Sequence, residues 1–317
     1  MSRLIEINNL KKYFYTAKGQ LHALDGVSLS IEHGSTLGVV GESGCGKSTL
    51  GRVILRLLEA SGGDVIFEGK DIFKMSAREL GTFRREAQII FQDPYASLNP
   101  RLTVGEIIAE PMIVNKTYRD RKKMQDQIFR MMSMVGLASR LINTYPHELD
   151  GGRRQRIGIA RALSLSPKFI VCDEPVSALD VSIQAQILNL LMDLQESLGL
   201  TYLFITHDLS VVKHISNEIA VMYLGVCVER APSKELFNNP IHPYTQALLR
   251  AIPLPNLSAR DQEDDILPGE VSDPVNLPAG CRFHSRCKYA GAKCMGKDIP
   301  LENLGSDHYV SCVLTGR

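Results

Sequence analysis

The stretch GESGCGKS, residues 41–48, constrains the fold of this 317-residue chain more than any other segment. It fits the pattern G-x-x-x-x-G-K-[ST], in which successive backbone N–H groups surround phosphates at the start of a helix. The strand-like run STLGVVG leads into it, and the apolar helix pattern TLGRVILRLL follows it. This order of strand, loop and helix predicts a nucleotide site. A glycine-rich turn without a ligand is the alternative.

The chemistry of such a loop gives its residues separate roles. The Lys47 ammonium would reach the β- and γ-phosphates, and the Ser48 hydroxyl would bind Mg²⁺. The Cys45 side chain is expected to point away from the nucleotide. The loop residues expected to contact the nucleotide are Gly41, Ser43, Gly44, Cys45, Gly46, Lys47, Ser48 and Thr49.

The rest of the pattern predicts an α/β fold. FIVCDE and TYLFITHD read as short buried strands, whereas SIQAQILNLLMDLQESLG reads as a helix. In RDRKKMQDQIFRMMSMVGL, apolar residues recur at helical spacing at Met124, Ile128, Met131 and Val135. Strands that alternate with helices predict a parallel sheet with helices on its faces. Residues from about 93 to 165 show no strand pattern, which predicts a helical insert.

An acidic pair follows one of these strands. Asp173 and Glu174 end the apolar run FIVC, about 125 residues after the phosphate loop. Asp173 would hold Mg²⁺, directly or through water, and Glu174 would act as general base on the attacking water. The alternative is an ordinary strand end.

Composition limits the class of protein. The net charge is +1, with 44% hydrophobic and 22% charged residues, which gives no indication of nucleic-acid binding. The longest apolar run, residues 219–228, is too short to cross a bilayer. The segment MSRLIEINNL has no secretory core, so a cytosolic protein is expected.

Six ordered motifs resemble the ATP-binding subunits of ABC transporters over nearly the whole chain. Besides the phosphate loop and FIVCDE, they are IIFQDP, ELDGGRRQRIGIARAL, SALD and FITHD. The resemblance implies a P-loop NTPase core of ABC type, RecA-like, with a mixed sheet. The core would span residues 1–252, with a helical subdomain at about 93–165.

The resemblance also assigns roles by position. Gln92 would sense the γ-phosphate and contribute to the Mg²⁺ site, and His207 would contact the γ-phosphate and help hold the water. Asp150, Gly151 and Gly152 occupy the signature loop, and Asp180 ends the D-loop. The adenine base would stack on Phe14, with Tyr13 and Tyr15 as competitors.

A closer similarity is to dipeptide and oligopeptide importer ATPases. It depends on FQDPYASLNPRLTVGEIIAEPM, DEPVSALDVSIQAQILNLLMDLQ and NNPIHPYTQALLRAIP, together with the cysteine tail. It implies a second ATPase subunit, two permease subunits and, indirectly, a substrate-binding protein, at the cytoplasmic side of the membrane. Nickel importers of the same subfamily are an alternative. A non-transport ABC protein and an iron–sulfur regulatory protein with a vestigial ATPase are others.

The signature loop departs from the family pattern. Where the family has Ser, this chain has Asp150, and the usual Gln is Arg153. A carboxylate would repel the γ-phosphate of the ATP held by the partner, which predicts a heterodimer with one degenerate site. The alternative is that Asp150 caps the following helix and changes little.

The last 37 residues contain four of the seven cysteines. A Pro-rich linker, with Pro253, Pro255, Pro268, Pro274 and Pro278, leads to them and opens an extension over residues 253–317. Cys281, Cys287, Cys294 and Cys312 have the spacing C-x5-C-x6-C-x17-C. This spacing lacks the C-x2-4-C pairs of structural zinc sites, so a [4Fe–4S] cluster is preferred over zinc, and free thiols are the third alternative.

Overall fold

The computed structural model describes residues 2–252 and 273–316. They form two compact units. The first contains residues 2–4, Ile31–Ser35 and Phe67–Ile205, and the second contains Ile5–Ser30, Thr36–Ile66, 206–252 and 273–316. Pro253, Pro255 and Pro268 of the predicted linker lie outside the described residues.

Three strands near the N-terminus were not predicted from the sequence. They are β1 (Arg3–Thr16), β2 (Gly19–Glu32) and β4 (Gly62–Phe67), and they lie in the order β2-β1-β4. Each is only partly buried, because polar residues such as those in EINNLKK interrupt the apolar pattern. Strands of this kind are hard to recognise by continuous apolar runs.

The other strands of the second unit lie in the order β11-β12-β10-β9-β3. β3 (Thr36–Val40) and β9 (Glu218–Tyr223) are parallel, whereas β9 and β10 (Val226–Pro232) form an antiparallel pair. The apolar run at 219–228 is therefore most of a hairpin. The helices of this unit are α1 (Lys47–Ile54), α7 (Leu209–Ile215), α8 (Ser233–Asn238) and α9 (Pro243–Arg250).

In the first unit, β6 (Ala87–Ile90), β7 (Phe169–Asp173) and β8 (Thr201–Ile205) are parallel neighbours. Every residue of β7 and β8 is buried. The short β5 (Lys70–Asp71) and the helices α2 (Ala77–Glu86) and α6 (Val181–Leu198) complete this part. Parallel and antiparallel ladders with interspersed helices confirm the predicted α/β fold with a mixed sheet.

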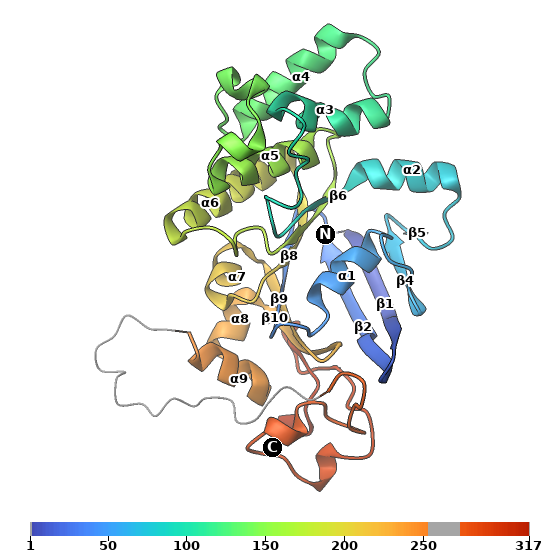
Figure 1. The fold of residues 1–317 in the computed structure, drawn as a ribbon. Helices are drawn as coiled ribbons and strands as arrows, with labels where there is room; N and C mark the ends of the chain where they lie inside the picture. Colours follow the sequence, from blue (N-terminus) through green and yellow to red (C-terminus); the bar gives the residue numbers. More distant parts are fainter. Residues whose placement is uncertain (1, 253–272, 317) are drawn as a thin grey trace, which may run out of the picture. The chain divides into compact units, whose positions relative to one another are not determined.

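Residues 93–165 contain helices and no strand. Three α-helices pack against one another and are labelled in Figure 1. They are α3 (Val104–Val114), α4 (Arg121–Met134) and α5 (Gly151–Leu163), with the 3-10 turns η1 (Ser139–Asn143) and η2 (Pro146–Glu148) between α4 and α5. The boundaries of the predicted subdomain stay a prediction.

The described residues after 272 form short elements. They are η4 (His284–Arg286), η5 (Ala292–Cys294), β11 (Glu302–Asn303), β12 (Tyr309–Val310) and η6 (Val313–Gly316). β12 pairs with β10 in the register Glu229↔Val310. None of the helices in residues 2–252 and 273–316 has the length and apolar character needed to cross a bilayer.

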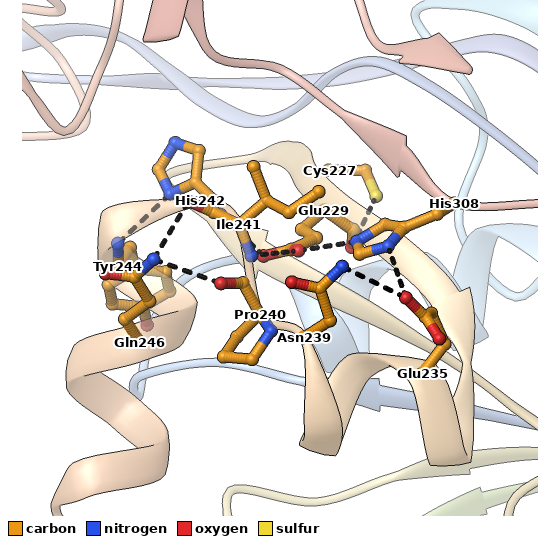
Figure 2. A network of polar contacts seen from close by, with 10 residues as sticks. All are labelled: Cys227, Glu229, Glu235, Asn239, Pro240, Ile241, His242, Tyr244, Gln246 and His308. Carbon is orange, nitrogen blue, oxygen red and sulfur yellow. Dashed lines mark hydrogen bonds and ion pairs between the residues drawn. The ribbon is translucent and has the colours of Figure 1, made fainter. Parts of the chain in front are cut away.

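A buried carboxylate fastens this C-terminal segment to β10 and α9 (Figure 2). Glu229 is fully buried and accepts hydrogen bonds from the backbone N–H groups of Ile241 (2.8 Å) and His242 (3.0 Å). Its Oε1 also lies 2.7 Å from Nε2 of His308, which is itself buried. Since buried carboxylates need such partners, His308 ties the tail to the core of the second unit.

Candidate functional site

The phosphate loop has the backbone that its sequence predicts. It joins β3 to α1, and Gly41 and Gly46 have φ of 152° and 104°. A Cβ at Gly41 would meet the Met222 carbonyl oxygen at 2.1 Å, and one at Gly46 would meet that of Ala23 at 2.2 Å. Only glycine fits these two positions.

The helix that follows the loop begins without a side-chain cap. Gly46 is its N-cap residue, and no acidic residue lies in the first turn. The first N–H groups and the helix dipole are thus compatible with an anion. Lys47 is buried, and its Nζ donates to the carbonyl oxygens of Gly41 (2.7 Å) and Glu42 (2.9 Å).

The loop residues differ in exposure. Ser43 and Gly44 are exposed, Ser48 and Thr49 are half-buried, and Cys45 is buried. Burial raises the pKa of the Cys45 thiol. The Cys45 carbonyl accepts the N–H of Gly225 (3.0 Å). Cys45 therefore anchors the loop to the rest of the protein.

The acidic strand end lies in the first unit. Asp173 is buried at the end of β7, and Glu174 follows it with a φ of 48°. The N–H of Glu174 donates to the carbonyl of Ile205 (2.9 Å), which holds this strained residue in place. Gln92 Nε2 donates to Glu174 Oε2 at 2.8 Å. Gln92 and Glu174 were assigned separate roles from the sequence, and the structure brings their side chains together.

His207 follows β8 and is exposed. Its neighbour Asp208 caps α7, because the Asp208 side chain accepts the N–H of Ser210 (2.8 Å). His207 therefore lies at the end of the predicted strand, and a helix that was not predicted begins after it.

Asp150 is the N-cap residue of α5. Its Oδ1 accepts the N–H of Arg153 at 2.8 Å, and its Oδ2 lies 3.5 Å from Nε of Arg153. This is the capping alternative considered for Asp150 from the sequence. Both side chains are more than half exposed.

The D-loop packs against the signature loop within the first unit. A Cβ at Gly152 would meet Cγ2 of Ile183 at 2.8 Å, and one at Gly151 would meet Cδ2 of Leu179 at 3.2 Å. Asp180 is exposed at the start of α6. The two glycines therefore allow α5 and the start of α6 to approach closely.

Two arginines of α5 contact the segment that follows Gln92. The Arg154 guanidinium lies 3.8 Å from the centroid of the Tyr95 ring, and Arg161 Nη1 donates to the Ser97 carbonyl (2.7 Å). Both contacts were missed from the sequence, where the arginines resembled ordinary helix residues. They connect the segment after Gln92 to α5.

The three N-terminal aromatics have different surroundings. Tyr13 donates its hydroxyl proton to Asp25 (2.5 Å), and burial raises the pKa of Tyr13 to about 12. Phe14 is half-buried beside Lys12, and Tyr15 is 88% exposed. The Tyr13 hydroxyl is thus bound within the protein.

Two family profiles match the chain. One, described as "ABC transporter", matches residues 24–177, and the other, described as "Oligopeptide/dipeptide transporter, C-terminal region", matches residues 228–294. The chain is 51% identical over 320 residues to "Oligopeptide transport ATP-binding protein OppF" of Salmonella typhimurium, which covers 98% of this chain and 96% of that protein. The chain belongs to the ABC transporter ATP-binding proteins.

Other relatives agree with this ABC assignment. "Dipeptide transport ATP-binding protein DppF" of Escherichia coli is 47% identical, over 98% of this chain and 93% of that protein. Among solved structures, cbiO1 from Clostridium perfringens, part of the ABC transporter complex cbiONQ, has a TM-score of 0.67 at 26% identity. It covers 75% of this chain and 92% of cbiO1.

A cassette solved with products gives a further comparison. The ATP-binding cassette MJ0796, in a dimeric post-hydrolysis state bound to ADP and Pi, has a TM-score of 0.65 at 30% identity, over 72% of this chain and 98% of that one. This chain is accordingly an ABC ATPase, and the ABC reaction implies ATP and Mg²⁺.

The cysteine tail of this ABC ATPase brings its thiols into one neighbourhood. Burial, together with the nearby thiols of Cys294, Cys312 and Cys287, raises the pKa of Cys281 to about 11. In residues 2–252 and 273–316, however, no group of three or more His, Cys, Asp or Glu side chains is arranged to hold a metal ion. The arrangement described here thus shows clustering of the thiols without a preformed ligand set.

Proposed function

We propose that this ABC ATPase hydrolyses ATP to power the import of oligopeptides or dipeptides through a membrane transporter. The observation that carries the proposal is the match along nearly the whole chain to proteins named for oligopeptide and dipeptide transport. The C-terminal profile supports it, because that region is defined by the same transporters. These relatives favour peptides over the nickel alternative.

The reaction assigns a role to each site residue. Lys47 and the N–H groups of the loop would bind the phosphates, and Ser48, Gln92 and Asp173 would hold Mg²⁺. Glu174 would take the proton of the attacking water, and His207 would contact the γ-phosphate. Phe14 is the proposed adenine platform, and this role is supported by the engagement of Tyr13 with Asp25.

The contact between Gln92 and Glu174 supports a gating role for Gln92. A carboxylate that accepts an amide N–H at 2.8 Å is held in one orientation. Release of Gln92 toward Mg²⁺ or phosphate would therefore free Glu174 to turn toward the attacking water. This links Gln92 to hydrolysis.

The proposed assembly is a heterodimer with a second ATPase subunit, bound at the cytoplasmic side of the membrane to two permease subunits. An extracytoplasmic binding protein would deliver the peptide. The presence of Asp150 in place of the signature serine supports one weakened ATP site. Its two carboxylate oxygens contact the backbone N–H and the side chain of Arg153, which offsets part of the negative charge. The proposed heterodimer would thus keep one site with an ordinary signature loop.

Cys281, Cys287, Cys294 and Cys312 are the proposed ligands of a [4Fe–4S] cluster, with zinc as the alternative. Burial raises the pKa values of Cys281 and Cys312, and the neighbouring cysteine thiols contribute to both increases, which supports a shared site. Iron and acid-labile sulfide in anaerobically purified protein would support the cluster. Zinc without iron in elemental analysis would refute it.

The function is tested by uptake of labelled peptides into proteoliposomes that contain the assembled transporter. Glu174→Gln should abolish ATP-driven uptake, with a rate loss of about 10²- to 10⁴-fold expected for a general base. Glu196→Gln, on the exposed face of α6, is the matched control and should keep activity. Uptake of Ni²⁺ instead of peptides would overturn the substrate assignment.

A further inference from the structure

Glu42, inside the phosphate loop, places a carboxylate beside a site for anions. Its backbone is tightly held: the N–H donates to Oη of the buried Tyr244 (2.9 Å), and its carbonyl accepts Nζ of Lys47 (2.9 Å). Glu42 is therefore part of the loop that surrounds Lys47. An uncompensated negative charge at this place would oppose phosphate binding.

The compensating charge comes from the cysteine tail. Arg286 Nη1 donates to Glu42 Oε2 at 2.8 Å, and Nη2 donates to Oε1 at 3.1 Å. The Arg286 side chain is 6% exposed and that of Glu42 is 25% exposed, so the pair is largely removed from water. Such a two-bond arginine–carboxylate contact is stronger and more directional than a surface ion pair.

The surroundings of Arg286 make this contact specific. Arg286 ends η4, between Cys281 and Cys287, and its guanidinium carbon lies 6.0 Å from the centroid of the Tyr223 ring. Phe283, in the same segment, packs edge-on against Tyr223 with a centroid distance of 5.4 Å. The backbone of the segment is thus fixed by aromatic packing.

A second arginine of the segment, Arg282, also supports the phosphate loop. Arg282 donates to the carbonyl of Leu224 and to Asp25. Gly225, which follows Leu224, donates its N–H to the carbonyl of Cys45 in the phosphate loop (3.0 Å). The segment between Cys281 and Cys287 therefore reaches the loop by two routes.

We propose that Arg286 is a positioning residue of the ATP site, which neutralises Glu42 and holds the phosphate loop in its binding conformation. This inference rests on the proposed binding of ATP by residues 41–49. It makes the cysteine-bearing tail a component of nucleotide binding. Loss of order around Cys281 and Cys287 would weaken ATP binding through Arg286.

The experiment measures the dissociation constant of a fluorescent ATP derivative with Mg²⁺ on the full-length chain. Arg286→Met should raise it about tenfold, equivalent to about 1.4 kcal/mol. Arg286→Lys keeps the positive charge but cannot form the same pair of hydrogen bonds to the Glu42 carboxylate. It should raise the dissociation constant about threefold. The loss should be smaller for the ADP derivative, because ADP carries less charge for Glu42 to repel.

Glu42 distinguishes charge compensation from a merely structural role. Glu42→Gln removes the repelling charge, so it should cost less affinity than Arg286→Met. The double variant Glu42→Gln/Arg286→Met should bind like Glu42→Gln alone, which is a partial rescue. Affinity losses that simply add in the double variant would overturn the proposal.

The matched control is Arg230→Met. Arg230 forms a two-bond pair with Glu218 (2.7 and 2.8 Å) of similar burial in the same unit. Arg230→Met should lower the melting temperature but leave nucleotide affinity unchanged.

If Arg286→Met does not fold, the inference is tested with Arg286→Lys and Glu42→Gln. Wild-type nucleotide affinity in both of these variants would refute it.

Lys47→Ala separates failure of this inference from failure of the proposed function. It should abolish binding of the ATP derivative, because the phosphate-binding ammonium is gone. Wild-type binding by Lys47→Ala would refute the proposed function itself. Loss of binding in Lys47→Ala together with wild-type affinity in Arg286→Met would refute only the role of Arg286.

Discussion

Two loops of this chain carry a carboxylate where phosphate binding is expected, and each compensates it differently. Glu42 is paired with Arg286, 244 positions further along the chain, in a contact largely shielded from water. Asp150 is paired with Arg153, three positions away, and both side chains are more than half exposed. The first carboxylate depends on tertiary structure, whereas the second depends on one turn of helix.

This difference determines how each site can be disturbed. A two-bond arginine–carboxylate contact that is shielded from water contributes strongly to the stability of the loop. Loss of one partner leaves the other charge uncompensated. An exposed ion pair contributes little, and salt screens it. The phosphate loop should therefore respond to distant changes in the tail, and the signature loop only to local ones.

Acid should weaken the support of Glu42. Burial lowers the pKa of His242 to about 4, from an ordinary value of 6.5. His242 lies beside Phe283 and Tyr244, which support the pair of Glu42 and Arg286. Its contribution to stability is therefore complete above pH 6.5 and is lost as the pH falls to about 4, on the order of 3 kcal/mol.

Urea denaturation of the full chain between pH 4 and pH 7 measures this loss. His242→Asn, which keeps a side-chain acceptor for the Tyr244 N–H but does not titrate, should flatten the pH dependence. An equal slope in the wild-type chain and His242→Asn would contradict the assignment.

The second largest effect is expected at the signature loop. Replacing Asp150 with Ser and Arg153 with Gln should raise the ATPase rate of the assembled transporter about tenfold, since a hydroxyl can donate to a phosphate oxygen. Asp120→Ser is the matched control, because Asp120 also caps a helix, α4, where its side chain accepts the Lys122 N–H. An unchanged rate in the double variant would discard the degenerate site.

The cap itself should matter less. Asp150→Ala removes the acceptor of the Arg153 N–H and should lower the unfolding free energy by about 1 kcal/mol. Asp180→Ala serves as control, because Asp180 begins α6 without a side-chain cap bond. Equal destabilisation in both variants would show that the capping bond is not the cause.

The smallest effect is expected for the Arg153 side chain. Arg153→Gln should change the unfolding free energy by less than about 0.5 kcal/mol, and the change should shrink at high salt. Denaturation at low and high ionic strength measures it. A large, salt-independent loss would remove the contrast with Arg286.

The sequence predicted those features that depend on neighbouring residues. The phosphate loop and the strand that ends at Asp173 follow from patterns a few residues long. The cap by Asp150 was the alternative to the predicted repulsion of phosphate. Continuous apolar runs identified the buried strands, and helical periodicity identified α4 and α6. The half-buried strands β1 and β2 lack both signals and were missed.

Contacts between distant positions could not be predicted in this way. Gln92 and Glu174 are 82 positions apart, and Arg154 meets Tyr95 across a loop of ordinary composition. Arg286 resembles any surface arginine between two cysteines. Such partners are determined by how the chain folds back on itself, which a single sequence does not encode in any local pattern.

The pairing of β12 with β10 has a consequence for solubility. Tyr309 and Val310 occupy the hydrogen-bonding edge of β10, and Ser311 donates its N–H to the Val228 carbonyl (2.9 Å). An uncovered strand edge is a template for pairing with another molecule. We therefore expect the short tail strand to protect β10 from pairing with other molecules. A protein shortened before residue 301 would expose that edge and should aggregate more readily.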